Sequence, residues 1–211
     1  MSLERALQDS REYFTRKITL HGPAPQGVDC NGPQAQFTRF EQLVKVVDPC
    51  SHFDLIDFGC GYGALLEYLS QRGWDFSYYG FDVLSSMVDA GRRAHKDQAN
   101  ALFTTDESTL PTCDYVIAGA IFNNKFQAPV VEWRDYTLAV LDRINSFSRK
   151  GMAFNILSIH SDADRMAQRP DLYFADPLAY FDHCKRNYSK DVALLHDYGL
   201  TDFTILVRKQ A

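Results

Sequence analysis

The sequence predicts an α/β fold: a doubly wound sheet of seven mostly parallel strands, preceded by an N-terminal helical lid. From residue 54 onward, short apolar segments alternate with segments of helical periodicity, which is typical of a parallel sheet with crossover helices. Near residue 200, two apolar segments flank Tyr198-Gly199, and this connection is too short for a crossover helix. The last two strands are therefore expected to be antiparallel.

The first 50 residues form a helical extension in this prediction. A first helix should end near Lys17, because apolar residues recur at helical spacing: Leu3, Ala6, Leu7, Tyr13 and Phe14. Residues 21–27 contain two glycines and two prolines, which regular elements do not tolerate, so this segment is expected to be a hinge. A second amphipathic helix is predicted over residues 37–47, ending before Asp48-Pro49. We expect the extension to close over a ligand site.

Residues 51–211 are expected to form the sheet domain. Its strands are predicted over residues 54–58, 76–81, 101–104, 115–119, 151–157, 192–196 and 203–207. Helices are predicted over residues 64–71, around 87–94, over 132–147 and over 177–187. Asp176-Pro177 begins the last of these helices, since Asp caps a helix and Pro fits its first turn.

The composition favours a globular protein that handles small molecules. Hydrophobic residues make up 45% and charged residues 23%, which excludes a disordered or low-complexity chain. The 22 basic and 27 acidic residues give a net charge of −5, which argues against nucleic acid as a partner. No apolar stretch could cross a bilayer and residues 1–17 lack a signal-peptide core, so we expect a cytoplasmic protein without a membrane partner. Five cysteines without a C-x-x-C pair predict reduced thiols and no metal site.

A glycine loop directly follows the first predicted strand. Its sequence is Gly59-Cys60-Gly61-Tyr62-Gly63, and glycine lets the backbone turn sharply and approach a ligand closely. Ligands of doubly wound sheets bind beyond the carboxyl ends of the strands at this position. Asp82 ends the second strand, where a carboxylate can accept hydrogen bonds from ribose hydroxyls or cap the next helix.

The G-x-G-x-G loop, with Asp57 two residues before its first glycine, resembles that of the class I S-adenosylmethionine-dependent methyltransferases, which have a Rossmann-like fold. The resemblance covers about residues 52–209. It implies S-adenosyl-L-methionine as cofactor and S-adenosyl-L-homocysteine as product. It also implies a cofactor site at the following residues: Asp57 near the methionine amino group, Gly59, Cys60, Gly61 and Gly63 around the methionine part, Asp82 at the ribose, Val83 beside the adenine, Asp106 and Glu107 near the adenine amino group, and Gly119 facing the methyl group.

A narrower resemblance links both ends of the chain to a group of largely uncharacterised bacterial methyltransferases of the small-molecule type. The matching segments are His21-Gly22, residues 27–31, Gln36-x-x-Arg39-Phe40, residues 174–178 and residues 195–199. The resemblance implies no particular acceptor. We expect a small molecule, because the chain lacks the Asn/Asp-Pro-Pro-Tyr/Phe motif of enzymes that methylate amino groups of nucleic acids. The assembly is expected to be a monomer or a homodimer.

Candidates for the acceptor side come from the extension and from loops after strands. Asn123 follows the fourth strand and would orient an acceptor or cap a turn, and Phe122 precedes it. His160 follows the fifth strand, where it would act as a general base or lie exposed in a loop. Polar residues of the extension are either lid contacts to cofactor and substrate or turn and capping residues: His21, Asn31, Gln36 and Arg39.

Two other functions compete with methyl transfer. An NAD-dependent oxidoreductase would use Asp82 equally well, but the loop is not G-x-G-x-x-G and no Tyr-x-x-x-Lys pair is evident. A non-catalytic cofactor-binding module would be favoured by loss of the glycines or of Asp82, and both are intact. The sequence therefore favours an enzyme that moves a methyl group to an unidentified acceptor.

Overall fold

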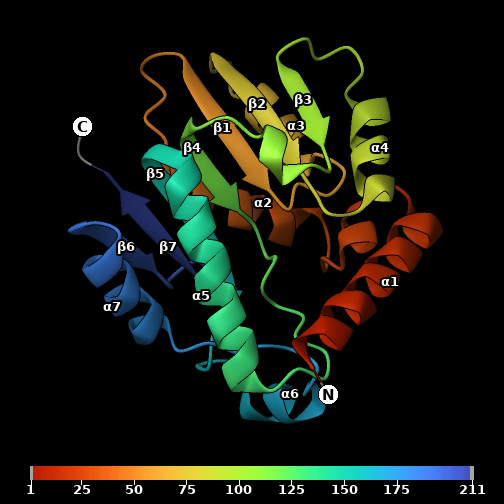
Figure 1. Cartoon of the computed structure of the whole chain (residues 1–211), viewed down its shortest axis with the longest axis vertical. Coiled ribbons are helices and arrows are strands. Elements are labelled where there is room, and N and C mark those ends of the chain that lie inside the picture. Colours follow the sequence, from red (N-terminus) through yellow and green to blue (C-terminus); the bar gives the residue numbers. More distant parts are fainter. Residues whose placement is uncertain (1, 210–211) are drawn as a thin grey trace.

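A computed structural model describes residues 2–209 as a seven-stranded sheet flanked by helices (Figure 1). The strands lie in the order β3-β2-β1-β4-β5-β7-β6. Their bounds are β1 (Phe53–Phe58), β2 (Phe76–Phe81), β3 (Ala101–Thr104), β4 (Cys113–Ala118), β5 (Ser148–Leu157), β6 (Asp191–Leu195) and β7 (Asp202–Arg208). Strands β1 to β5 are parallel, and β7 pairs antiparallel with both β5 and β6. The predicted fold class is confirmed.

Seven α-helices and three short 3₁₀ helices occupy the described residues. The α-helices are α1 (Leu3–His21), α2 (Pro33–Leu43), α3 (Ala64–Ser70), α4 (Ser85–Ala94), α5 (Val130–Phe147), α6 (Ala163–Gln168) and α7 (Pro177–Asn187). The 3₁₀ helices are η1 (Pro25–Val28), η2 (Val44–Val46) and η3 (Glu107–Thr109). Asp176 caps α7 as predicted, because its carboxylate accepts hydrogen bonds from the Leu178 and Ala179 amides. Within residues 2–209, no helix has the length and apolar character to cross a membrane.

The extension differs from its prediction in three places. α1 continues to His21, one full turn beyond Lys17, and ends at Gly22. The Gly/Pro segment holds η1, whose first residue, Pro25, has a backbone angle suited to a helical turn and no N–H to satisfy. For the same reason α2 begins at Pro33, four residues earlier than predicted. Apolar periodicity does not detect these ends, because prolines and glycines set them.

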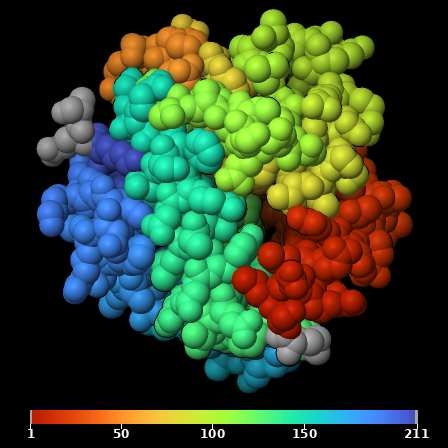
Figure 2. All heavy atoms as spheres, in the orientation of Figure 1, coloured from red at the N-terminus to blue at the C-terminus, as the bar shows by residue number. Residues whose placement is uncertain are grey.

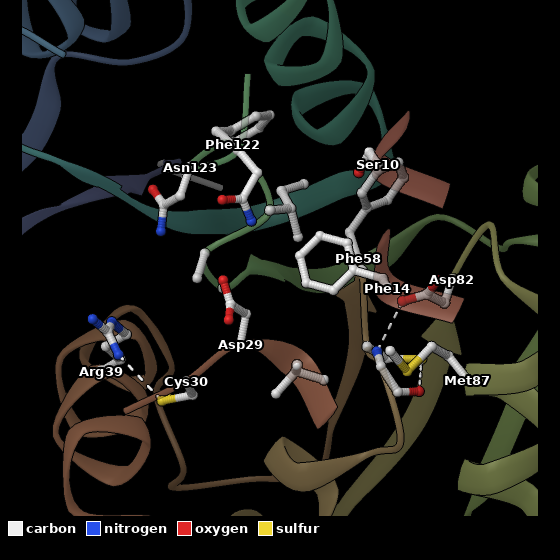
Figure 3. Close-up of a pocket in the computed structure, with 18 of the residues that line it drawn as sticks. Ser10, Phe14, Asp29, Cys30, Arg39, Phe58, Asp82, Met87, Phe122 and Asn123 are labelled. Carbon is white, nitrogen blue, oxygen red and sulfur yellow. Dashed lines mark hydrogen bonds between the residues drawn. The ribbon is translucent and has the colours of Figure 1, made fainter. Parts of the chain in front are cut away.

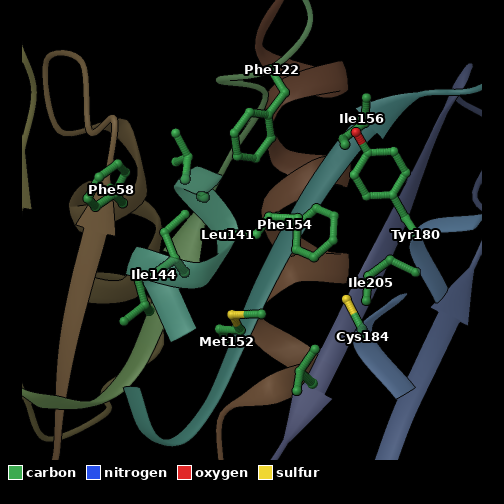
Figure 4. Packing of buried hydrophobic residues seen from close by; sticks show 14 of the residues in the cluster. Phe58, Phe122, Leu141, Ile144, Met152, Phe154, Ile156, Tyr180, Cys184 and Ile205 are labelled. Carbon is green, nitrogen blue, oxygen red and sulfur yellow. The ribbon is translucent and has the colours of Figure 1, made fainter. Parts of the chain in front are cut away.

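Two layers of apolar side chains pack on the sheet, one on each face. Leu141 and Ile144 of α5 pack with Phe154 of β5, and α7 covers the same face (Figure 4). On the other face, α2 and α3 contribute Leu43 and Leu66 to a second buried cluster. Successive residues of β1 alternate between these layers, as expected for a central strand. Packing on both faces holds the sheet in place, and with it the carboxyl ends of the strands, where the site lies.

Candidate functional site

A cavity of about 390 Å³ lies at the carboxyl ends of β1, β2 and β4. Figure 3 shows its walls: Asp29, Cys30 and Arg39 come from the extension, Asp82 and Met87 from the end of β2 and from α4, and Phe122 and Asn123 from the loop after β4. The volume lies within the range of small-molecule sites. The position is the one at which doubly wound sheets bind their ligands.

Gly59 and Gly61 of the glycine loop line the cavity. Gly59, Gly61 and Gly63 have φ values of +83°, +54° and +86°, a left-handed region that favours glycine. A Cβ at Gly59 would lie 2.3 Å from Cγ2 of Ile121, so any side chain at this position would clash with the segment after β4. Cys60 also lines the cavity and is buried. This cradle of bare backbone fits a cofactor that must lie directly against the chain.

Asp82 holds the glycine loop and α4 in place together. One carboxylate oxygen accepts a hydrogen bond from the Gly61 amide at 3.0 Å, and the other accepts one from the Leu84 amide at 2.9 Å. Burial raises the pKa of Asp82, while these two hydrogen bonds oppose the shift. The carboxylate still lines the cavity beside the exposed Val83 and keeps unused lone pairs, so capping and ribose binding are compatible.

Asp57 is the buried acid of the site. It lies near the carboxyl end of β1, and its carboxylate accepts a hydrogen bond of 2.6 Å from the Tyr78 hydroxyl. Burial raises the pKa of Asp57 to about 7; the Tyr78 hydrogen bond opposes this shift and the nearby charge of Asp82 adds to it. A buried carboxyl that titrates near neutral pH would gain a compensating charge from a ligand ammonium group.

The extension forms the opposite wall of the cavity. One face of α1 lines it, through residues spaced by three and four: Leu7, Ser10, Arg11 and Phe14. The segment from Val28 to Asn31 and the α2 residues Gln36, Arg39 and Phe40 complete the wall. Figure 2 shows the N-terminal residues as a layer of atoms against the segments of α4 and α5. α2, in contrast, also packs on the sheet through Leu43.

Arg39 lies in the wall, but its guanidinium is already paired. Its Nε and Nη2 donate hydrogen bonds of 2.9 and 3.0 Å to the two carboxylate oxygens of Asp202, which is fully buried. Asp202 also accepts a hydrogen bond from Asn155, whose side-chain oxygen accepts one from the Ala120 amide. This network ties α2 to the backbone at the end of β4. Gln36 lines the same wall and accepts a hydrogen bond from the Tyr62 hydroxyl at 3.3 Å.

The far end of the cavity is aromatic. Phe122 and Trp133 are buried there, and Tyr136 packs against Trp133 with ring centroids 5.2 Å apart. Asn123 lines this end, yet its side-chain oxygen accepts a hydrogen bond from the Leu157 amide. Its side chain therefore braces the loop after β4 against β5, the structural alternative that the sequence left open.

Five predicted site residues lie outside the cavity lining, and these placements are corrections: His21, Gly63, Asp106, Glu107 and His160. An added Cβ at Gly63 would meet the side chains of His95 and Phe103, so this glycine allows close packing within the protein. Asp106 uses its carboxylate to cap η3 through the Ser108 amide, and Glu107 pairs with Arg143. His160 is exposed and packs near His196, while His21 ends α1 at the surface. Asp106, Glu107 and His160 come shortly after strand ends, yet none of them lines the cavity. Over the described residues, no three His, Cys, Asp or Glu side chains gather closely enough to hold a metal ion.

Several residues that line the cavity come from helices and were not among the predicted site residues. Arg11 and Phe14 of α1, Met87 of α4, Tyr136 of α5 and Arg165 of α6 all line the cavity. The face of α1 could have been found from its spacing, because Arg11 falls on the same stripe as Leu7 and Phe14. Arg165 carried no such signal, since α6 has only six residues.

Comparisons with known proteins agree with this geometry. A model described as a methyltransferase domain matches residues 56–129. A Mycobacterium tuberculosis protein, Rv1506c, whose name describes it as a methyltransferase, is 48% identical over 166 residues, which cover 79% of this chain and 99% of that protein.

Solved structures with this fold also contain the expected cofactor product. The N-methyltransferase NodS of Bradyrhizobium japonicum, solved with S-adenosyl-L-homocysteine, has a TM-score of 0.64 over 95% of this chain and 98% of that chain, at 12% identity. The magnesium protoporphyrin IX methyltransferase of Synechocystis, also solved with S-adenosyl-L-homocysteine, has a TM-score of 0.56 over 74% of this chain and 73% of that chain, at 17% identity. These likenesses show the fold, and the 48% identity shows the family. The chain belongs to the class I S-adenosylmethionine-dependent methyltransferases, with S-adenosyl-L-methionine as its cofactor.

Proposed function

We propose that this enzyme transfers the methyl group of S-adenosyl-L-methionine to a small-molecule acceptor. The observation that carries the proposal is the position of α1, which lies across the cavity and lines it with Leu7, Arg11 and Phe14. A site walled on both sides leaves room for a compact acceptor and excludes a large folded one. Closure of this kind also excludes water from the reacting groups.

The residues present would hold the cofactor in a simple way. Its sulfonium supplies an already activated methyl group, so the protein's task is to bind, orient and exclude water. The backbone from Gly59 to Gly61 would lie against the methionine part, and Asp57 would accept a hydrogen bond from its ammonium group. Asp82 would accept the ribose hydroxyls. Gly119, at the end of β4, lines the cavity where acceptor and methyl group would meet.

A labelling experiment tests the acceptor class. The enzyme is incubated with S-adenosyl-L-methionine carrying a deuterated methyl group and with a cell extract separated into small-molecule and macromolecular fractions. We expect the label in one or a few compounds of the small-molecule fraction, found by mass spectrometry. Label confined to protein or nucleic acid would overturn the proposed acceptor class, while the Gly61→Val enzyme controls for background transfer.

Asp82→Ala tests the ribose contact. We expect S-adenosyl-L-homocysteine binding to weaken by about 1.5–3 kcal/mol, the scale of hydrogen bonds to a charged group, as measured by calorimetric titration. An analogue without ribose hydroxyls should lose much less. Asp106→Ala is the matched control, because Asp106 caps η3 outside the cavity lining. Equal losses for both ligands would show that Asp82 acts only by holding Gly61 and Leu84.

Asp57 should make cofactor binding depend on pH. Its pKa is about 7 because burial disfavours the charged form, and a bound ammonium group would favour that form. Affinity for S-adenosyl-L-homocysteine should therefore rise by up to about tenfold per pH unit below pH 7 and level off above it. The pKa of Asp57 is 3.8 in the unfolded chain and about 7 in the ligand-free folded protein. The free energy that this group contributes to folding therefore falls as the pH rises between these two values. Calorimetry from pH 5.5 to 8 on wild type and Asp57→Asn checks this: the variant should bind weakly with little pH dependence, and a flat wild-type profile contradicts the account.

We further propose that residues 1–50 act as a lid that the cofactor orders, over the sheet domain of residues 51–211. Gly22 has a φ of +66° and open space around it, which suits a hinge between α1 and η1. The segment after this hinge contributes Val28 to Asn31 to the cavity wall. Closure of this segment over the bound cofactor would therefore complete the cavity wall.

Hydrogen exchange measures this ordering directly. Amides between Leu20 and Phe40 should exchange more slowly once S-adenosyl-L-homocysteine is bound, while amides of α7, remote from the cavity lining, should not change. If the glycine loop becomes protected and residues 20–40 exchange identically in both states, the extension is scaffold rather than lid.

A further inference from the structure

We infer that the acceptor carries an anionic group attached to an apolar, aromatic-sized body, and that Arg11 and Arg165 bind the anion. The inference rests on the proposed function, because it concerns the acceptor end of the same cavity. Three features carry it: an apolar wall, two cationic side chains without a carboxylate partner, and the distribution of acids around the cavity.

The apolar wall occupies the end of the cavity away from the glycine loop. Phe122 lines it from the loop after β4, and Trp133 and Tyr136 line it from α5. The Trp133 indole N–H already donates a hydrogen bond of 2.8 Å to the Phe122 carbonyl. The indole thus offers its apolar surface rather than a donor, which suits a flat apolar body.

Four arginines line the cavity, and two of them are committed to acids. Arg39 forms the two hydrogen bonds to Asp202, and Arg169 lies 2.8 Å from Asp171. Arg11 and Arg165, in contrast, have no carboxylate within 4.0 Å among residues 2–209. Arg165 is half-buried and Arg11 is exposed, and both line the cavity.

The elements that carry these arginines meet at the aromatic end. The Tyr13 ring of α1 packs on Phe126 of the loop after β4, at 5.6 Å between centroids. The Phe126 amide donates to the Asp171 carbonyl, which joins that loop to the segment following α6. Burial raises the pKa of Tyr136, and positive charges, including that of Arg11, oppose the shift.

The acids of the cavity do not neutralise this end. Asp57 and Asp82 lie on the glycine-loop side, and Asp29 is held by Lys17 at 2.7 Å. The chain as a whole carries a net charge of −5, so a positive acceptor end is a local feature rather than a consequence of composition. Guanidinium groups recognise carboxylate, phosphate and sulfonate oxygens, and these are the acceptor anions that the site fits.

Two dyes of nearly the same shape test the inference without knowledge of the acceptor. 8-Anilinonaphthalene-1-sulfonate carries an anionic group on an apolar body, and N-phenyl-1-naphthylamine has the same body without the anion. Each is titrated by fluorescence into protein saturated with S-adenosyl-L-homocysteine, so that the cofactor end is filled. The variants are the double substitution R11Q/R165Q and the control R16Q/R186Q, which removes the same charge from exposed positions outside the cavity lining.

We expect R11Q/R165Q to weaken binding of the sulfonate dye about tenfold and to leave the neutral dye within about twofold. The control should change neither, and added salt should weaken only the sulfonate dye. Equal losses for both dyes, an unchanged sulfonate affinity in R11Q/R165Q, or no binding of the sulfonate dye would overturn the inference. The calorimetric titration with S-adenosyl-L-homocysteine is independent, so failure of the dye test with intact cofactor binding leaves the proposed function standing.

Discussion

Gly61→Val is expected to weaken S-adenosyl-L-homocysteine binding by roughly 100-fold or more while the sheet still folds. Gly61 has a φ of +54°, which costs an L residue about 1–2 kcal/mol, and β-branched side chains tolerate it least. A Cβ there would also lie 3.0 Å from Cγ1 of Val28 in the extension. A valine must therefore either move the loop, which breaks the Gly61–Asp82 hydrogen bond, or fill the space that the cofactor needs.

Gly73→Val separates backbone strain from loss of the site. Gly73 has a similar φ of +67° but nothing within 4 Å of an added Cβ, and it lies in the turn after α3. We expect this control to lose stability and to retain wild-type affinity by calorimetric titration. If folded Gly61→Val protein, checked by circular dichroism, binds S-adenosyl-L-homocysteine like wild type, the glycine loop is not the cofactor cradle.

Asp202→Ala is expected to lower the free energy of unfolding by about 3–5 kcal/mol, the scale for removing one partner of a buried ion pair. Asp202 is fully buried and accepts both hydrogen bonds of the Arg39 fork as well as that of Asn155. Without it, a mostly buried guanidinium and an amide lose their acceptor. Urea denaturation should show a lower midpoint at an unchanged slope.

Two further variants make this prediction specific. Asp191→Ala, at the exposed start of β6, removes the same charge and should stay within about 0.5 kcal/mol of wild type. The double variant R39M/D202L replaces the pair with apolar side chains and should be markedly more stable than Asp202→Ala. A loss below about 1 kcal/mol in Asp202→Ala would mean that the pair does not hold the extension to the sheet.

The sequence predicted the sheet well because its elements are local patterns. Strand and helix segments alternate from β1 onward, and the short connection before β7 requires an antiparallel pair. The glycine loop and Asp82 could be located for the same reason, since both directly follow predicted strands. A residue directly after a parallel strand lies at the carboxyl edge of the sheet, and this position does not depend on how distant parts of the chain pack.

Residues farther from a strand end could not be placed by the same reasoning. Asp106 and Glu107 follow β3, yet the turn into η3 points them at their own backbone and at α5. From the sequence, Arg39 is either a lid contact to cofactor and substrate or a turn and capping residue, and only the fold shows that its guanidinium pairs with Asp202, 163 residues away. The cationic acceptor end could not be predicted from the sequence either, because Arg11 and Arg165 come from separate helices that only the tertiary structure brings together.

Ligand titration under matched conditions tests the central claim most directly. The purified protein is titrated calorimetrically with S-adenosyl-L-homocysteine and, separately, with NAD, and its melting temperature is measured with each ligand, since binding to the folded state raises it. The account predicts saturable binding of one S-adenosyl-L-homocysteine per chain, a raised melting temperature and no response to NAD. Binding of NAD with no response to S-adenosyl-L-homocysteine would contradict it, because the glycine loop and Asp82 would then serve a dinucleotide.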